Sequence, residues 1–332
     1  DVLKTLDKAA CLIDEGPIHI NCRFRKPLDP VAKPFDLASL SGRKDAFYKT
    51  APIGIKTKDT IIDFSQSIEE VAGLINGSEC GLIIAGPEAP YRICQNLEKL
   101  GEVLGWPIIA DIHSQYRFGS KADNVIGHFD LLTDADIPDF PSPRTIIHVG
   151  GLPTSKGLIK YLLGLKGMEY IKIQDHERTI DPDRLETKRL TGDPDKIIDL
   201  LIPKLTSREN TAGRDKLRAA DLECDRFLSE HFADKRLTEP SLAFGLGKLI
   251  RDGDGLYLSS SMPIRDAESF MGIRTSNIIV GANRGASGID GVIATACGFA
   301  LGCERPTTLL LGDLTFIHDL NSLALVKKSE IP

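Results

Sequence analysis

The sequence lacks long apolar runs and an excess of basic residues. No stretch approaches the roughly 20 consecutive apolar residues that a membrane span needs. Lys and Arg number 41 against 47 Asp and Glu, which gives a formal net charge of −6. Most nucleic-acid-binding domains instead carry a basic face. The sequence therefore predicts no membrane span and argues against nucleic acid as a partner.

The cysteines lack the spacing of a metal site or a disulfide framework. The seven of them are scattered, with no C-x-x-C arrangement, and most lie in apolar segments: Cys11, Cys22, Cys80, Cys94, Cys224, Cys297 and Cys303. In such segments a cysteine is usually a small buried side chain. We expect a reducing compartment, no disulfide framework and no structural zinc.

An initiator methionine and a signal peptide are also missing. The sequence begins Asp1-Val2-Leu3-Lys4 and stops at Ile331-Pro332, straight after a helical pattern. We interpret it as an excised fragment, so the absence of targeting signals says little about the whole protein.

Apolar runs alternate with amphipathic stretches along most of the chain. Such alternation predicts α/β domains with doubly wound parallel sheets. Predicted strands cover residues 17–21, 80–86, 107–112, 145–150, 170–173, 255–258, 277–280 and 307–311. Predicted helices cover residues 65–75, 88–104, 155–165, 195–201, 207–236 and 238–251, and two more begin near residues 289 and 315. No G-x-G-x-x-G follows the first strand of this series, so a dinucleotide site of the usual kind is not supported.

Four local predictions follow from single residues. Thr238 and Thr315 are candidate N-caps, and Pro240 suits the first turn of the helix after Thr238. His148 lies inside an apolar strand, where a core histidine with satisfied hydrogen bonds is the expected role.

Three successive strands in the last third of the chain end in polar loops, at residues 259–265, 283–287 and 312–315. In a parallel sheet all three converge on one edge, where open α/β sheets bind ligands. Glycines in the middle loop allow a ligand to approach the backbone closely. Helix starts offer unpaired N–H groups to an anion. This edge is therefore predicted to bind phosphate or another anion.

Charged side chains at this edge suggest a more specific chemistry. Asp313, beside a glycine at a strand end, is placed to hold Mg²⁺ together with phosphate oxygens and water, but it can equally cap the following helix. Arg265 and Arg284 suit carboxylates, which they can bind bidentately, although either can be a plain surface residue. His318 and Asp319 are expected on an exposed helix face.

The chain resembles the MenD family, the 2-succinyl-5-enolpyruvyl-6-hydroxy-3-cyclohexene-1-carboxylate (SEPHCHC) synthases. The most specific match is Asn-Arg-Gly-Ala-Ser-Gly-Ile-Asp-Gly at residues 283–291. Gly-Asp-Leu at 312–314, Asp-Leu-Asn-Ser-Leu-Ala-Leu at 319–325, Ser-Met-Pro-Ile-Arg at 261–265 and Gly-Pro-Ile-His-Ile-Asn-Cys at 16–22 also resemble the family. The resemblance spans essentially the whole chain. Gly-Asp alone would indicate only a thiamine-diphosphate enzyme.

The resemblance implies a transferase of menaquinone and phylloquinone biosynthesis that uses thiamine diphosphate with Mg²⁺ or Mn²⁺. Its small-molecule substrates would be 2-oxoglutarate, which is decarboxylated, and isochorismate, to which the succinyl unit is added 1,4. A homo-oligomer, at least a dimer, is implied because the family's site is shared between subunits. We expect a cytoplasmic protein, or a plastid one in a photosynthetic eukaryote.

The resemblance also implies a domain plan. Residues 1–50 would be the end of a pyrimidine-binding domain and a linker, 51–205 a central α/β domain, 206–236 a linker helix, and 237–332 the first half of a diphosphate-binding domain. The glutamate that activates the cofactor would lie before the chain, and the second metal ligand after Pro332. No catalytic residue is thus expected in the fragment, which alone should be inactive.

Site residues are carried over by matching position. Ser261, Arg265 and Arg284 would hold substrate carboxylates, and Lys156 would reach from the central domain toward isochorismate. Asp313 would be a metal ligand, and the full set of expected cofactor-binding residues is Ser287, Gly288, Ile289, Gly312, Asp313 and Leu314. Ile289 would be the apolar wedge that bends the cofactor.

Two positions depart from the family pattern. Gly157 stands where some members carry an arginine, and Ser259-Ser260 stand where Gly-Asn is expected. These departures leave alternatives open. One is another thiamine-diphosphate 2-oxoacid decarboxylase or carboligase, and the other is a noncatalytic anion-binding α/β module.

Overall fold

The computed structural model describes residues 64–87, 96–120, 122–135, 142–176, 181–209, 211–234, 236–284 and 288–328. Contacts divide the chain into two units, Asp1–Ile62 and Asp63–Pro332, and every element below belongs to the second. The strand predicted at residues 17–21 and the first turns of the helix predicted at 88–104 lie outside the described residues.

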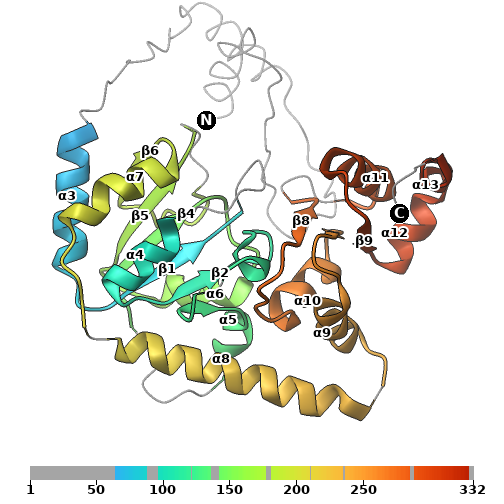
Figure 1. The fold of residues 1–332 in the computed structure, drawn as a ribbon, viewed down its shortest axis with the longest axis horizontal. Coiled ribbons are helices and arrows are strands. Elements are labelled where there is room, and N and C mark those ends of the chain that lie inside the picture. Colours follow the sequence, from blue (N-terminus) through green and yellow to red (C-terminus); the bar gives the residue numbers. More distant parts are fainter. Residues whose placement is uncertain are drawn as a thin grey trace, which may run out of the picture. The chain divides into compact units, whose positions relative to one another are not determined.

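Sheet A is a six-stranded parallel sheet with the order β3-β2-β1-β4-β5-β6 (Figure 1). Its strands are β1 (Gly81–Ala85), β2 (Ile108–Ala110), β3 (Val125–Ile126), β4 (Thr145–Val149), β5 (Glu169–Gln174) and β6 (Lys188–Thr191). The central strand β1 pairs with both β2 and β4, so the strand order reverses there. This confirms the predicted doubly wound fold. The sequence did not predict β3, which is two residues long, or β6, which is mostly polar.

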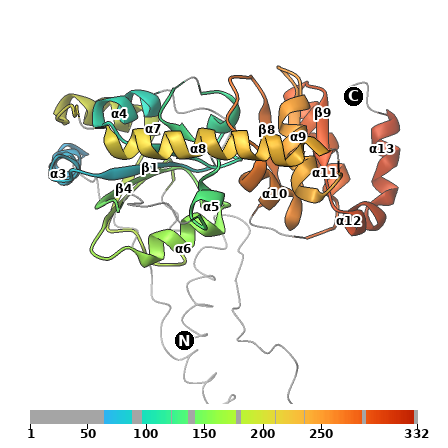
Figure 2. The same ribbon diagram turned by 90° about the horizontal axis from the view of Figure 1, so that it is seen from below.

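Helices cover both faces of sheet A. One core cluster joins the sheet to α3 (Phe64–Asn76), α4 (Asn96–Leu104) and α7 (Pro194–Leu201). The other joins it to α5 (Phe129–Leu132), α6 (Lys156–Gly164) and α8 (Ala212–His231). Figure 2 shows α4 and α7 on one side and α5 and α6 on the other. Burial on both faces explains why β1 and β4 appear in the sequence as continuous apolar runs.

His148 is a core histidine, as predicted. It is 1% exposed; its Nε2 lies 2.7 Å from the carbonyl oxygen of Gly151, and its Nδ1 lies 2.7 Å from the Tyr170 hydroxyl. Because a carbonyl only accepts, Nε2 carries the proton and Nδ1 accepts from Tyr170. Burial lowers the pKa of His148 well below its ordinary value, and Lys172 lowers it further.

Sheet B is a second parallel sheet, with β7 (Gly255–Leu258) between β8 (Ile279–Ala282) and β9 (Thr307–Leu310). Leu256 and Leu258 pack with α9 (Glu239–Leu249) and α10 (Met262–Phe270). Tyr257 points to the other face and packs against α11 (Val292–Cys303). Two short helices follow, α12 (Asp313–His318) and α13 (Leu323–Lys328). β8 begins two residues later than predicted.

One of the two predicted N-caps is present. Thr238 caps α9: its Oγ1 accepts a hydrogen bond from Ser241 N at 3.2 Å, and Pro240 lies in the first turn. The Thr315 cap is wrong, because α12 begins at Asp313 with Gly312 as its N-cap. The four described cysteines are free, and no described helix is long and apolar enough to cross a membrane.

Candidate active site

The three polar strand ends do meet at one edge of sheet B. β7 pairs in parallel with β8 through Leu258 and Ala282, and with β9 through Leu258 and Leu310. The residues that follow these three partners therefore leave the sheet side by side. A hydrogen bond of 2.7 Å from Ser260 Oγ to the carbonyl oxygen of Asn283 joins the first two loops. The sequence prediction of a common edge is thus confirmed.

Ser261 occupies the start of α10 in an unusual backbone conformation. Its φ of 74° and ψ of −127° lie in a region that L-residues rarely adopt, and its side chain makes no capping hydrogen bond. Such strain is found where the surrounding structure enforces it, often at functional sites. The sequence predicted a loop at residues 259–265. The structure corrects this, because α10 begins at Met262. Arg265 therefore lies in the first turn of a helix.

The loop after β8 places Arg284 at the same edge. Tyr257 donates a hydrogen bond to the side chain of Asn283, which fixes the start of this loop. Arg284 itself is exposed. Ser287 lies outside the described residues. Gly288 follows, and then Ile289, which is 40% exposed, an open apolar side chain next to polar loops.

Asp313 opens α12 directly after β9. Its carboxylate is exposed and accepts one hydrogen bond at 2.8 Å from the neighbouring Leu314 N. Gly312, with extended backbone, is the N-cap of the helix. Asp313 is therefore not the N-cap residue, but its carboxylate does accept one N–H group of the first turn, as the cap alternative expected. A carboxylate oxygen at this position remains open to solvent, as a ligand for a hard cation requires. Leu314 is 68% exposed.

Asp319 is not on an exposed face, contrary to prediction. It is 9% exposed, and its Oδ2 accepts a hydrogen bond from Ile293 N at 2.7 Å, at the start of α11. Burial raises the pKa of this carboxyl, but hydrogen bonds from Ser322, Ile293 and Ala294 outweigh it and lower the pKa overall. The Asp319 carboxylate therefore stabilises the amino-terminal end of α11, the helix that follows the Arg284 loop. His318 is 52% exposed, as predicted, and pairs with Asp290 at 3.2 Å.

Sheet A contributes its own loop to the site. Asp111 directly follows β2, and its Oδ2 accepts a hydrogen bond from Thr154 N at 2.5 Å, in the loop after β4. His113 is two residues further on. Burial lowers its pKa, the charge of Asp111 opposes this, and the charge of Arg284 lowers the pKa further. Sequence reasoning missed both residues. A carboxylate right after a buried strand, the signal that marked Asp313, would have found Asp111.

Lys156 lies at the first position of α6, on the sheet A side. Ser155 caps this helix by accepting a hydrogen bond from Leu158 N at 2.9 Å. The Lys156 side chain is exposed. No contact among the described residues joins Lys156 to Ser261, Arg284 or Asp313.

Gly157 packs closely against α5. Its N–H donates to Asp130 Oδ1 at 2.9 Å. A Cβ built there would lie 2.4 Å from Thr133 Oγ1 and 2.8 Å from the same Asp130 oxygen. An arginine at this position would require the side chains of Thr133 and Asp130 to shift. The departure from the family pattern therefore goes with close packing between α5 and α6.

A buried pair fastens α10 to the loop after β2. Arg117 is fully buried and donates to the carbonyl oxygens of Ala110, Glu268 and Met271 at 2.6–2.9 Å. Its Nη2 also lies 3.0 Å from Glu268 Oε1. Glu268 Oε2 accepts from Ile112 N at 2.6 Å. These contacts fix the helix that carries Arg265 against the sheet A loop that carries His113.

No cluster of three metal-binding side chains occurs in the part of the chain that the structure describes. At Asp313 the structure offers one exposed carboxylate, which could serve a cation together with phosphate oxygens and water. That donor set suits Mg²⁺, which is usually bound by one or two carboxylates plus phosphate. The described residues therefore fit a diphosphate held through a metal ion.

The fold places the chain among the open α/β proteins, whose ligands usually bind beyond the carboxyl ends of the parallel strands. A solved structure of the same fold is titled as a putative thiamin diphosphate-dependent enzyme from Mycobacterium smegmatis. It matches with a TM-score of 0.54 and 15% identity, over 81% of this chain and 51% of that one. At that identity the match shows the fold alone.

The family follows from the sequence comparison. Residues 74–258 match the family model described as "Middle domain of thiamine pyrophosphate". The chain therefore belongs to the thiamine pyrophosphate enzymes that this middle domain defines.

Curated relatives carry the name that the sequence resemblance suggested. A Rubrobacter xylanophilus protein named 2-succinyl-5-enolpyruvyl-6-hydroxy-3-cyclohexene-1-carboxylate synthase is 34% identical over 98% of this chain and 57% of its own length. Proteins of the same name from Haloarcula marismortui and Chlorobium phaeobacteroides are 32% and 34% identical, over 93% and 96% of this chain and 54% of each relative. The resemblance is thus confirmed, and the chain spans little more than half the length of these relatives.

Proposed function

We propose that this protein acts as a SEPHCHC synthase, which decarboxylates 2-oxoglutarate and adds the succinyl unit to isochorismate with thiamine diphosphate and Mg²⁺ or Mn²⁺. The observation that carries the proposal is the common edge of sheet B, where Ser261, Arg284 and Asp313 follow three adjacent parallel strands. The names of the relatives supply the reaction.

Each part of the edge has a proposed role. Asp313 would hold the metal ion, and Gly288, Ile289, Gly312 and Leu314 would line the cofactor. When bound, thiamine diphosphate supplies the electron sink for decarboxylation, and the protein supplies binding and orientation. The exposed Ile289 is available to pack against the cofactor. Ser287 has the same proposed role as its neighbours.

Three cationic side chains are proposed to bind the substrates, both of which are carboxylic acids. Arg265 and Arg284 would pair with carboxylates, to which the guanidinium fork is matched. Ser261 would donate a hydrogen bond from its strained position. Lys156 would contact isochorismate from the sheet A side. We also propose that the protein is cytoplasmic and at least dimeric.

The test follows 2-oxoglutarate-dependent loss of isochorismate by the full-length protein with thiamine diphosphate and Mg²⁺, comparing wild type, Asp313→Asn and the control Asp252→Asn. We expect Asp313→Asn to lose about two orders of magnitude in rate, because a metal ion supplies several kcal/mol of charge stabilisation. Calorimetry should show weaker Mg²⁺-dependent cofactor binding. Asp252 accepts a hydrogen bond from Asn277 N at 2.6 Å, before β8. Asp252→Asn should therefore leave the rate and the cofactor binding unchanged.

Three outcomes would change the proposal. An active Asp313→Asn variant with unchanged metal dependence rejects Asp313 as the ligand. Cofactor binding without loss of isochorismate indicates another thiamine-diphosphate carboligase. No cofactor binding at all indicates a noncatalytic module.

A further inference from the structure

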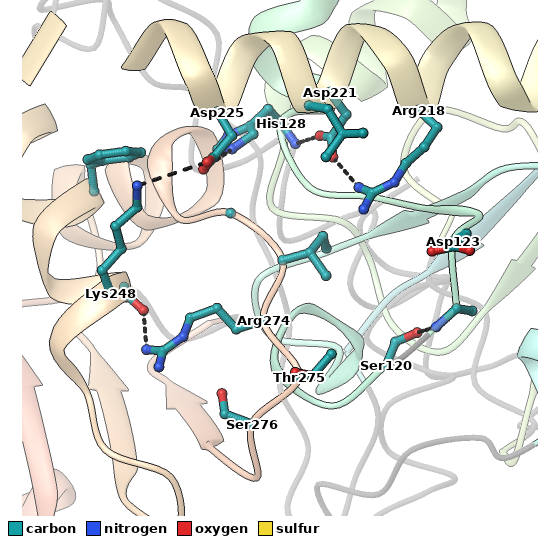
Figure 3. Close-up of a pocket in the computed structure, with 16 residues that line it drawn as sticks. Ser120, Asp123, His128, Arg218, Asp221, Asp225, Lys248, Arg274, Thr275 and Ser276 are labelled. Carbon is teal, nitrogen blue, oxygen red and sulfur yellow. Dashed lines mark hydrogen bonds and ion pairs between the residues drawn. The ribbon is translucent and has the colours of Figure 1, made fainter. Parts of the chain in front are cut away.

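A cavity of about 550 Å³ lies where α8 meets both sheets (Figure 3). Its size falls within the range of roughly 300–1,000 Å³ that is usual for small-molecule sites. Its lining comes from the segment before and after β3, from α8, from the end of α9 and from the segment before β8. The side chains used below are Asp123, His128, Arg218, Asp221, Asp225, Lys248, Arg274 and Ser276.

This cavity is separate from the proposed active site. Residues 274–276 precede β8, and the end of α9 precedes β7, so the sheet B part of the lining belongs to the amino ends of these strands. Ser261, Arg284 and Asp313 follow the carboxyl ends. A ligand in the cavity would therefore not occupy the cofactor edge, and the inference does not rest on the proposed function.

Most charges of the lining neutralise one another. Arg218 pairs with Asp221 at 2.9 Å, and the other oxygen of Asp221 accepts from the backbone N–H groups of Gly127 and His128 at 2.9 and 2.8 Å. Lys248 Nζ lies 3.9 Å from Asp225 Oδ2. Figure 3 shows Arg218, Asp221 and Asp225 on α8, with Lys248 reaching toward Asp225.

One cation and one carboxylate remain after these pairs. The Arg274 guanidinium donates to the carbonyl oxygens of Gly247 and Ile250 at 2.5 and 3.0 Å but pairs with no carboxylate of the described chain. Asp123 is exposed and makes no ion pair or side-chain hydrogen bond within the described ranges. The lining thus offers an unpaired positive group and an unpaired negative group, borne by different segments.

Two buried polar atoms of the lining also lack a hydrogen-bond partner within the described residues. Ser276 is 9% exposed, and its Oγ has no partner. His128 is 1% exposed, and its Nε2 has none, with Asp225 Oδ1 at 3.6 Å. Because Nδ1 of His128 faces the carbonyl oxygen of Ser269 at 3.0 Å, Nδ1 is the donor of that hydrogen bond. Unpaired buried groups cost free energy, and a ligand can satisfy them.

We propose that this cavity binds a small zwitterion of the amino-acid class. The carboxylate of the ligand would accept hydrogen bonds from the Arg274 guanidinium and the Ser276 hydroxyl. The forked guanidinium matches the two oxygens of a carboxylate. The ammonium group of the ligand would bind toward the Asp123 carboxylate, which only accepts. A ligand with no net charge also matches a lining whose three cations and three carboxylates balance.

The test uses ω-amino acids, which keep the two end groups and vary their separation: glycine, 4-aminobutyrate and 6-aminohexanoate. Butyrate and butylammonium each carry one end group only. Binding to the full-length protein is measured by saturation-transfer NMR and by the rise of the thermal unfolding midpoint with concentration. We expect saturable binding of at least one amino acid and at least tenfold weaker binding of butyrate and butylammonium.

Three variants test the residues proposed to bind the carboxylate and the ammonium group of the ligand. Arg274→Gln and Asp123→Asn should each weaken binding about tenfold, the usual size for losing a hydrogen bond to a charged group. Ser276→Ala should also weaken it, yet leave the free protein as stable as wild type or more so, because it removes an unpartnered buried hydroxyl. The controls are Asp134→Asn, at an exposed position outside the cavity, and Ser78→Ala. Ser78 is buried but partnered, with its Oγ 2.9 Å from the carbonyl oxygen of Cys80.

The proposal is overturned if no amino acid of the series binds saturably, or if butyrate binds as tightly as 4-aminobutyrate and its longer and shorter analogues. It is also overturned if Ser276→Ala and Ser78→Ala affect binding equally, since that result would reflect stability and not a site.

Discussion

Sheets A and B differ in how completely their strands are buried. Every residue of β1, β2 and β4 is buried, whereas every residue of β9 is only half-buried. Exposed apolar side chains follow β9 on α12 and α13: Leu314, Phe316, Ile317, Leu323, Leu325 and Val326. The open edge of sheet B also carries the proposed cofactor residues. Sheet A is therefore the more completely buried sheet. Its loop after β2 contacts α10, which packs on sheet B, and sheet B carries most residues of the proposed site.

The largest expected effect breaks the connection between the two sheets. Arg117→Ala should lower the free energy of unfolding by about 3–5 kcal/mol, because it removes the donor to three buried carbonyl oxygens and one of the two donors to the Glu268 carboxyl. Urea unfolding measures the loss. The control is Arg226→Ala on α8, whose pairs with Glu223 and Glu230 are exposed and should contribute nothing measurable. Equal losses in the two variants would contradict the scaffold role of Arg117.

A second experiment sharpens the contrast in burial. Ile147, in β4, is 0% exposed and belongs to the main core cluster, so Ile147→Ala should cost about 2–5 kcal/mol. Leu309 lies at a half-buried position of β9. Leu309→Ala should lower the free energy of unfolding by less than about half as much as Ile147→Ala, because it removes less buried surface and leaves a shallower cavity. Equal costs, measured in the same urea series, would show that sheet B is as tightly packed as sheet A.

A third test uses pH to follow the contact between the sheets. Burial raises the pKa of Glu268 to about 8, although Arg117 opposes this. An ordinary glutamate has a pKa of about 4.3. Because the folded pKa is the higher one, the folded protein binds the extra proton, and this stabilisation is full below about pH 4 and is lost as the pH rises through about 8.

The wild-type free energy of unfolding should therefore fall by about 1 kcal/mol more than that of Glu268→Gln between pH 6 and 7. Parallel pH profiles of the two proteins would contradict the raised pKa. Circular dichroism during urea unfolding at each pH is sufficient to measure the difference.

The smallest expected effect concerns the strained start of α10. Ser261→Gly should raise the free energy of unfolding by about 1 kcal/mol, since glycine adopts a positive φ without strain. Ser260→Gly is the matched control and should lower it, because Ser260 Oγ bonds to the Asn283 carbonyl oxygen at 2.7 Å. If the proposed function holds, Ser261→Gly should also consume 2-oxoglutarate more slowly. A less stable Ser261→Gly variant would show that the conformation carries no strain.

Local sequence patterns predicted the regular parts of both sheets well. The apolar runs marked β1, β2, β4, β5, β7, β8 and β9, and polar residues after three of them marked the common edge of sheet B. These patterns depend only on which side chains share one face of a strand or helix. They failed at β3 and β6, which are too short or too polar for such a pattern, and at α10, whose start was taken for loop.

The sequence by itself determined the class of fold, the strand ends that carry Ser261, Arg284 and Asp313, and the resemblance to SEPHCHC synthases. Only the tertiary structure decided that Arg117 is buried against Glu268, that Asp319 holds the start of α11, and that a cavity opens beneath α8. The physical reason is separation along the chain. Contacts such as that between Arg117 and Glu268, 151 residues apart, arise from the packing of whole elements, which no local periodicity records.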